Sequence, residues 1–276
     1  MSTPFAPEMA SNHRESPAAN QHGMPQDTGS GGSLPPKMRL ATRDIVKQYN
    51  KRRVVDGISL SVETGSVVGL LGPNGAGKTT TFYSIAGFIR PDAGRVMLDD
   101  EDITALAIHR RARKGLAYLP QESSVFKKLT VEENVRIILE PMGLSRKEIK
   151  QRIDYLLEEL KLGYLTNNPA HSLSGGERRR VEIMRALAMR PRFILLDEPF
   201  AGIDPLSVAD LQEIIIDLKR RGLGILISDH NVRETLAVCD RAYIVNHGQI
   251  LTQGTADDII NSPEARQMYL GEHFTL

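Results

Sequence analysis

One glycine-rich segment constrains the fold of this 276-residue chain more than any other. It matches the pattern G-x-x-x-x-G-K-[ST] and consists of Gly72, Pro73, Asn74, Gly75, Ala76, Gly77, Lys78 and Thr79. An apolar run, 66–71, precedes it, and a helical pattern, 79–87, follows it. Glycines let backbone N–H groups surround a phosphate chain without Cβ clashes, and the helix adds its positive end. This context predicts a buried strand, a phosphate-binding loop and a helix rather than a chance glycine-rich turn.

Two side chains of this segment have predicted chemical roles. Lys78 is expected to reach the terminal phosphates of a nucleotide, and the Thr79 hydroxyl to bind Mg²⁺. Thr80 extends the predicted nucleotide-binding segment by one residue. The sequence therefore predicts a nucleotide with a phosphate chain and Mg²⁺ as ligands.

A second apolar strand, 193–196, ends in two adjacent carboxylates, Asp197 and Glu198. Neighbouring side chains at a strand end point in different directions, so the two acids can have different roles. We expect Asp197 to hold Mg²⁺, usually through water, and Glu198 to orient and polarise the attacking water. The alternative is a strand that simply ends in solvent, and the phosphate-binding loop makes that interpretation the weaker one.

A third apolar strand, 224–227, is followed closely by His230. This histidine could contact the terminal phosphate, or it could position Glu198 and the water. A single histidine at a strand end is also compatible with a purely structural role, and the local sequence leaves the two alternatives open.

A second helix also begins with glycines, after Leu173. Ser174 is a natural N-cap, and Gly175, Gly176 and Glu177 follow it, so the first N–H groups of this helix are expected to be exposed. The segment is either a second anion site or an ordinary capped helix. The arginines 178–180 are expected to form a solvated face, while the opposite face packs inward through Val181, Met184 and Leu187.

The order of these elements predicts the fold class. Apolar strands alternating with helices indicate an α/β protein with a mostly parallel core sheet covered on both faces. Residues 123–172 are expected to be mostly helical, and 242–254 to form a hairpin. Residues 1–36 are rich in Pro, Ser, Gly, Asn and Gln, so we expect a disordered tail before a domain spanning 37–276.

Composition excludes several classes of protein. The net charge is +1, aromatic residues make up 5% and there is no tryptophan, so we expect no nucleic-acid partner. The single cysteine, Cys239, allows neither an intrachain disulfide nor a cysteine metal cluster, which is typical of the reducing cytosol. The apolar runs are shorter than the roughly 18 residues of a membrane helix. We therefore expect a cytoplasmic protein that reaches a membrane only through partners.

Together the motifs resemble those of the ATP-binding cassette (ABC) ATPases over about residues 38–276. They are GPNGAGKT at 72–79, Gln121, LSGGE at 173–177, LLDEP at 195–199, the stretch 201–204, and His230. The resemblance implies the P-loop NTPase fold of ABC ATPases, with an antiparallel β part and a helical subdomain at about 123–172. It also implies a head-to-tail homodimer in which each ATP lies between one phosphate loop and Ser174–Glu177 of the other copy.

The same resemblance implies roles for further residues. Tyr49 is expected to stack on adenine, Gln121 to sense Mg²⁺ and the transmembrane partner, and Asp204 to communicate across the dimer. The helical subdomain is expected to contact a permease, and His230 and the LSGGE segment gain functional roles.

Several longer strings are similar to the ATPase subunits of lipopolysaccharide export transporters. They include 77–83, 172–183, 229–239 and 269–272. The similarity implies ATP-driven lipopolysaccharide export through two permease subunits, with this chain peripheral on the cytoplasmic face of the bacterial inner membrane. Phe126, Lys127 and Lys128 then become candidates for a groove that receives the permeases, although an aromatic beside basic residues could equally form a surface helix cap.

Three alternative functions remain. The nearest is the ATPase subunit of a branched-chain amino acid importer. A soluble ABC protein acting on DNA or ribosomes is disfavoured because the interval from Lys78 to Asp197 has no room for a second cassette or a coiled-coil insertion. A nucleotide-dependent scaffold without turnover is disfavoured because both Glu198 and His230 are present.

Overall fold

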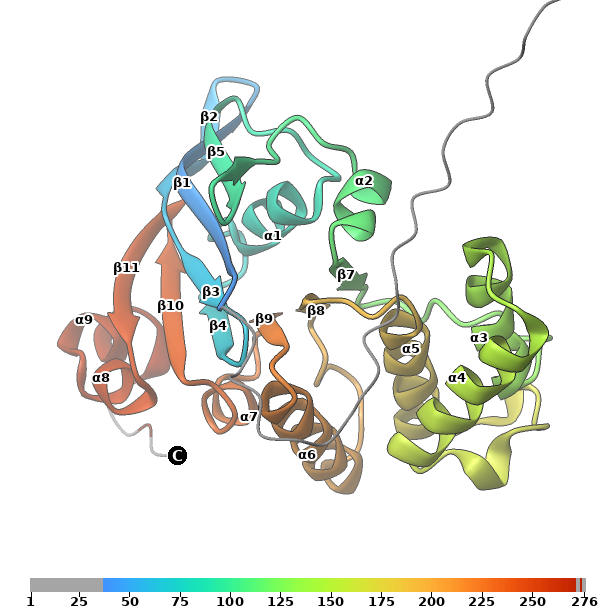
Figure 1. The fold of residues 1–276 in the computed structure, drawn as a ribbon. Coiled ribbons are helices and arrows are strands. Elements are labelled where there is room, and N and C mark those ends of the chain that lie inside the picture. The colour runs from blue at the N-terminus through green and yellow to red at the C-terminus, as the bar shows by residue number, and fades with distance from the viewer. Residues whose placement is uncertain (1–36, 272–273, 275–276) are drawn as a thin grey trace, which may run out of the picture. The chain divides into compact units, whose positions relative to one another are not determined.

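An antiparallel sheet forms the first part of the described chain (Figure 1). The computed structural model describes residues 37–271 and 274, and the tail predicted for residues 1–36 lies outside the described residues. The strand order is β2-β1-β5-β6, with β3 also paired to β1. The strands are β1 (Arg39–Tyr49), β2 (Arg52–Ile58), β3 (Ser61–Glu63), β5 (Ala93–Leu98) and β6 (Glu101–Asp102).

A second, mostly parallel sheet of six strands has the order β11-β10-β4-β9-β8-β7. Its strands are β4 (Val67–Leu71), β7 (Leu116–Leu119), β8 (Phe193–Asp197), β9 (Gly224–Ser228), β10 (Arg241–Asn246) and β11 (Gln249–Gly254). Only β10 and β11 pair antiparallel, through a turn in which His247 and Gly248 both have positive φ. The α/β class, the parallel core sheet and the hairpin are confirmed.

Both faces of the parallel sheet are buried, which explains why its strands are continuously apolar. On one face Ile194, Leu196 and Ile227 pack with helices α5 (Gly175–Ala188) and α6 (Pro205–Arg220). On the other face Leu70 and Leu195 pack with α1 (Lys78–Ala86) and the antiparallel sheet. Shorter helices complete the chain: α2 (Ile108–Arg113), α7 (Val232–Leu236), α8 (Ala256–Asn261), α9 (Pro263–Ala265) and a last turn over Arg266–Leu270.

The predicted helical region contains α3 (Val131–Leu139), α4 (Arg146–Glu159) and three short 3₁₀ turns. Two capping boxes begin its helices: Thr130 with Glu133, and Ser145 with Glu148. Ser145 is thus the N-cap of α4. The long α5 follows, and Figure 1 shows α3 and α4 beside it.

The strand register gathers the predicted site residues at one edge of the parallel sheet. Leu70 of β4 and Asp197 of β8 both pair with Ser228 of β9. The loops that leave these strands therefore start side by side at their carboxyl ends, where ligands bind in open α/β sheets.

Arg111 fixes the other end of α1. Its side chain is 1% exposed and donates hydrogen bonds to four backbone carbonyls, those of Ser84, Ile85, Thr104 and Leu106. Burial lowers the pKa of this guanidinium to about 10, while the charge of Asp102 opposes the shift. The cation thus lies against the negative end of the helix that begins at the phosphate loop.

We expect Arg111→Met to lower the free energy of unfolding by about 3 kcal/mol, because it leaves several buried carbonyls without donors. Urea unfolding of the full chain measures the change. The exposed neighbour Arg110 offers the matched control, Arg110→Met, which should change stability little. Equal losses in the two variants would contradict a structural role for Arg111.

Candidate functional site

The loop between β4 and α1 is held against two hairpins. Gly77 has φ of 107°, and a Cβ there would lie 2.5 Å from the Val54 carbonyl oxygen. The Ala76 carbonyl accepts a hydrogen bond of 2.8 Å from the Gly248 N–H. Only glycine satisfies both the backbone conformation and the close approach at position 77.

Lys78 lies inside this loop. It is 7% exposed, and its Nζ donates to the carbonyls of Gly72 at 2.6 Å and Pro73 at 3.0 Å. Burial lowers the pKa of Lys78, while the negative charges of three carboxylates, Glu198, Asp229 and Asp197, oppose this shift. The ammonium and these carboxylates therefore act on one another electrostatically. Asn74, Gly75 and Thr79 are exposed and Thr80 is half-buried, so the cradle opens to solvent.

Asp197 ends β8 as a buried carboxylate, 5% exposed. The Tyr118 hydroxyl donates a hydrogen bond of 3.1 Å to its Oδ2. Burial raises the pKa of Asp197 to about 6, and the charges of Glu198 and Asp229 add to the shift, while the Tyr118 bond and Arg179 oppose it. The charged form of this group is destabilised, so a bound cation would stabilise it.

Glu198 contacts two other predicted site residues. Its Oε2 accepts a hydrogen bond of 2.7 Å from Gln121 Nε2 and lies 3.2 Å from His230 Nδ1. Its N–H donates to the Ser228 carbonyl at 2.6 Å, and its φ of 43° is unusual for a residue with a Cβ. Both side-chain contacts are on Oε2, and no hydrogen bond from the described residues occupies Oε1. The carboxylate is thus held from one side with its second oxygen free.

Asp229 is a buried site residue that the sequence analysis did not select. Its Oδ1 accepts from the backbone N–H groups of His230 at 2.7 Å and Asn231 at 2.8 Å, and its Oδ2 accepts from Phe200 N–H at 3.0 Å. Burial raises the pKa of Asp229, and these donors oppose the shift. The signal was available, because Asp229 follows an apolar strand just as Asp197 and Glu198 do.

The expected solvated face at 178–180 is wrong. Arg179 is buried and donates from Nη1 to the Pro120 carbonyl at 2.8 Å and to Glu182 Oε2 at 2.9 Å. Its Nη2 also donates to the Asp197 carbonyl at 3.4 Å. Glu182 lies one turn away on the same helix, but Pro120 and Asp197 are distant in sequence, so a local charge pattern could not indicate those two partners. The inward face is confirmed, because its three predicted members are buried: Val181, Met184 and Leu187.

The second glycine-rich helix start has the predicted cap. Ser174 Oγ accepts from the Glu177 N–H at 3.2 Å, and Glu177 Oε2 accepts from the Ser174 N–H at 2.8 Å. A Cβ at Gly176 would lie 2.4 Å from Ser207 Oγ, so this helix approaches the start of α6 closely. Gly175 lines a small cavity of about 100 Å³ that Gln121 and Glu198 also line. No hydrogen bond between described residues links 174–177 to the phosphate loop of the same chain.

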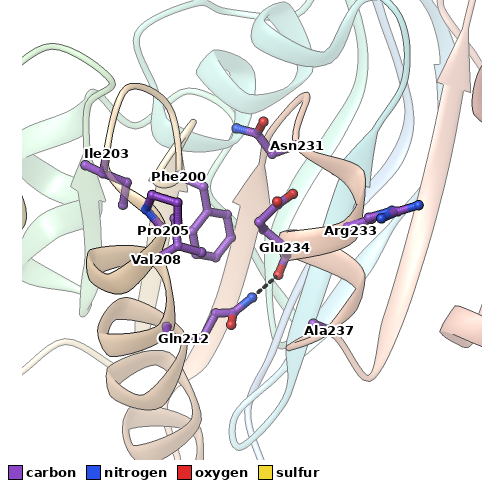
Figure 2. A pocket seen from close by; sticks show the side chains of 10 residues that line it. Phe200, Ile203, Pro205, Val208, Gln212, Asn231, Arg233, Glu234 and Ala237 are labelled. Carbon is purple, nitrogen blue, oxygen red and sulfur yellow. Dashed lines mark hydrogen bonds between the residues drawn. The ribbon is translucent and has the colours of Figure 1, made fainter. Parts of the chain in front are cut away.

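Asp204 is the N-cap of α6, where its Oδ1 accepts from the Ser207 N–H at 3.0 Å. Hydrogen bonding by the Ser207 side chain, and then by its N–H, lowers the pKa of the carboxyl. A cavity of about 610 Å³ lies between α6, which Asp204 caps, and α7. Figure 2 shows Phe200 and Val208 on the α6 side, and Glu234 on α7, whose carbonyl accepts from Gln212 Nε2 at 3.0 Å. No residue of the phosphate loop lines this cavity.

Tyr49 lies away from these groups, at the end of β1. Its ring is 44% exposed, and Lys47 Nζ lies 5.4 Å from the ring centroid. Val54, on the paired strand β2, approaches the phosphate loop at Gly77. Strands β1 and β2 thus connect Tyr49 to the phosphate loop, and part of the Tyr49 ring is exposed to solvent.

Phe126 is 45% exposed, and the guanidinium of Arg185 lies 4.8 Å from its ring centroid. Its backbone N–H and carbonyl both bond to the Asn134 amide, at 2.8 and 3.1 Å. The cap of α3 is Thr130, so the alternative that Phe126 forms a surface helix cap is wrong. Lys127 and Lys128 are exposed beside it.

Comparisons with known proteins agree with this geometry. A family model described as ABC transporter matches residues 55–201. The lipopolysaccharide export system ATP-binding protein LptB of Acidithiobacillus ferridurans is 57% identical over 237 residues, which cover 86% of this chain and 98% of that protein. LptB of Escherichia coli (strain K12) is 52% identical over 238 residues, covering 86% of this chain and 99% of that protein.

Solved structures give the same result. The ADP conformation of MJ1267, an ATP-binding cassette of an ABC transporter, has a TM-score of 0.76 at 33% identity and covers 85% of this chain and 99% of its own. A nucleotide-free ATP-binding cassette from an ABC transporter has a TM-score of 0.76 at 32% identity, and the match covers 85% of this chain and 100% of that chain. The chain therefore belongs to the ABC transporter family, as a subunit that binds and hydrolyses ATP to drive transport.

Proposed function

We propose that this chain works as a homodimer that powers lipopolysaccharide export through two transmembrane permease subunits. The names of the LptB relatives support this cargo, and identity extends over nearly their whole length. Among the described residues, no helix combines the length and apolar content needed to cross a membrane. In this proposal the chain lies on the cytoplasmic face of the bacterial inner membrane, bound to its permeases.

The ATP site is proposed at the phosphate loop, 72–80. Lys78 already binds two carbonyls of the loop, and it would exchange them for the terminal phosphates. Tyr49 would stack on the adenine, because its ring is exposed on the strand pair that contacts the loop. Strand β1 and helix α1 carry Tyr49 and Lys78, and the proposed roles of these two residues require no change in the secondary structure of either element.

The residues near this loop also suit Mg²⁺, which prefers oxygen ligands. Thr79 offers a hydroxyl, Gln121 an amide oxygen and Asp197 a carboxylate. Asp197 fits best, since burial without a cation destabilises its charge. When bound, the ion would neutralise charge on the phosphates.

The placement of Glu198 carries the proposed hydrolytic role. Gln121 and His230 hold its Oε2, so Oε1 can accept a proton from the attacking water. The water oxygen bonds to the γ-phosphorus while the bond from that phosphorus to the ADP oxygen breaks. His230 would position the carboxylate, and its Nε2, which has no hydrogen-bond partner among the described residues, would contact the terminal phosphate. Asp229 holds the backbone at His230.

A second copy completes the proposed site. Ser174–Glu177 forms an exposed helix start that makes no hydrogen bond to the described phosphate loop of its own chain. Its free N–H groups suit a phosphate. Head-to-tail pairing would bring it to the ATP of the other copy, with Asp204 at the contact between copies.

We further propose an ABC ATPase domain at 37–276 whose helical subdomain spans about 123–172. Its exposed Phe126, with Lys127 and Lys128, would form the groove for the permeases. A half-exposed aromatic ring beside cations is a common anchor in protein interfaces.

Glu198→Gln should bind ATP and dimerise but lose about two to four orders of magnitude in turnover, the usual contribution of a general base. Steady-state ATPase assays and nucleotide-dependent sedimentation measure the two effects. Glu122→Gln changes an exposed acid next to Gln121 and serves as the control. Unchanged hydrolysis in Glu198→Gln would remove Glu198 from this role.

Asp197→Asn should stabilise the nucleotide-free chain in EDTA. The raised pKa, about 6 against 3.8, means that the folded state binds this proton more tightly than the unfolded state. The stability from this group is fully present below the unfolded value and is lost as pH rises through the folded value. The variant should therefore gain up to about 3 kcal/mol over the native chain at neutral pH, and less at acidic pH. Urea unfolding across this range tests it; a pH-independent difference would contradict it.

Purification of the tagged chain from its own membranes in mild detergent should recover two permease subunits of a lipopolysaccharide exporter. Amino acid permeases in their place would establish the importer alternative. Phe126→Ala should weaken recovery by about tenfold or more, because an interface anchor contributes about 2 kcal/mol. The exposed Met268 provides the control, Met268→Ala. Equal recovery in both variants would exclude the proposed groove.

A further inference from the structure

Another pocket lies at the opposite edge of the parallel sheet, near the amino ends of β8 and β9. It is a cavity of about 230 Å³ between α4, the end of α5 and the end of α6. Pro191 and Leu223, just before the two strands, belong to its wall. Because β8 runs from Phe193 to Asp197, roughly 13 Å of extended chain separates this pocket from the ATP site.

Three arginines line this pocket: Arg152, Arg190 and Arg221. Glu159 is the one acidic residue of the lining, so the three guanidinium groups and one carboxylate leave a net charge of two positive units. Leucines complete the wall. A small cavity with this composition has an apolar floor and a cationic rim.

Arg152 is the most enclosed of the three. Its Nη2 donates to the Leu187 carbonyl at 2.7 Å, and its guanidinium lies 5.4 Å from the Tyr155 ring centroid. Its Nε is buried and has no hydrogen-bond partner. Burial lowers the pKa of Arg152, and the charges of Arg190 and Arg221 add to that effect, with Glu159 opposing it.

The other two arginines differ in what they bind. Arg221 pairs with Glu159, and its Nη1 donates to the Tyr155 hydroxyl at 3.3 Å. Arg190 is exposed and forms no ion pair with any residue in the described part of the chain. It also has a φ of 52°, a costly conformation for a residue with a Cβ.

Helix capping accounts for only part of this arrangement. The bond from Arg152 to the Leu187 carbonyl caps the end of α5, and Arg221 is the C-cap residue of α6. Neither function uses Arg152 Nε or the charge of Arg190. Like charges gathered at a cavity repel one another, and an anion between them would remove that cost.

We propose that this pocket binds a phosphate group, as a second anion site that is separate from the ATP site. Guanidinium groups match the geometry of phosphate oxygens and bind them through paired hydrogen bonds. Its volume of about 230 Å³ admits only a small ligand. The leucine floor favours a monoester with a compact apolar body, although free phosphate offers the rim the same chemistry.

Calorimetric titration of the full chain tests the site with two probes, phenyl phosphate and inorganic phosphate. A saturating non-hydrolysable ATP analogue keeps the phosphate loop occupied, and potassium chloride of equal ionic strength serves as the blank. Binding beyond the blank, tighter for phenyl phosphate, assigns the site to an ester, and equal affinity assigns it to free phosphate. Absence of binding by both probes overturns the proposal.

Arg190→Ala should weaken binding by about tenfold or more, as expected for a lost charged hydrogen bond. Arg220→Ala, an exposed arginine outside the pocket, is the matched control and should bind like the native chain. ATPase activity should be unchanged in both variants, which separates this site from the proposed hydrolytic machinery. Equal affinities in Arg190→Ala and Arg220→Ala would show that the binding lies elsewhere and overturn the proposal.

Discussion

The parallel pairing of β4, β9 and β8 is the constraint on which the rest of the structure depends. It places three loop starts at one edge, and each loop brings a different chemistry: glycines with Lys78, two carboxylates, and Asp229 with His230. The pairing requires strands that are apolar on both faces, so the same residues that build the core also gather the site. No single loop contains a complete set of groups.

A layer of buried polar residues then fixes these loops. Asp229 binds three backbone N–H groups from two loops, including that of Phe200 beyond β8. Arg179 links α5 to the Pro120 and Asp197 carbonyls. Both groups are buried, and the bonds to Phe200 and Pro120 connect segments that are distant in sequence, which makes these contacts costly to disturb. A shift of α5 would therefore displace Asp197 at the end of β8 and Pro120, the residue before Gln121.

The difference between the proposed ligand-binding groups and the buried polar residues that support them explains which features the sequence could predict. The groups proposed to bind the nucleotide follow apolar strands in short motifs, so Lys78, Asp197 and Glu198 could be predicted from the local sequence. The α/β fold class and the parallel sheet could also be predicted, because apolar runs are local signals. The same holds for helix caps such as Ser174 and Ser145, because a capping residue lies directly before its helix. The residues that support the site could not be predicted, since Tyr118 bonds to Asp197 and Arg179 bonds to the Pro120 carbonyl, both far away in sequence. The cargo was predicted only from longer strings that resemble lipopolysaccharide export ATPases, because the motifs of the ATP site do not specify what is transported.

Carboxylates lie at the carboxyl ends of the parallel strands, and arginines lie near the amino ends. The electrostatics of helix ends explains only part of this distribution of charge. Helix α6 begins at the carboxylate of Asp204 and ends with Lys219 and Arg220, as a helix dipole favours. That effect falls off within a turn, so it accounts for residues at helix ends and for little beyond them. Arg190 lies past the end of α5 in a left-handed conformation and pairs with no described carboxylate. The charge of Arg190 adds to those of Arg152 and Arg221 at one cavity that has a single acidic lining residue, and this excess of positive charge is the physical reason to propose a ligand there.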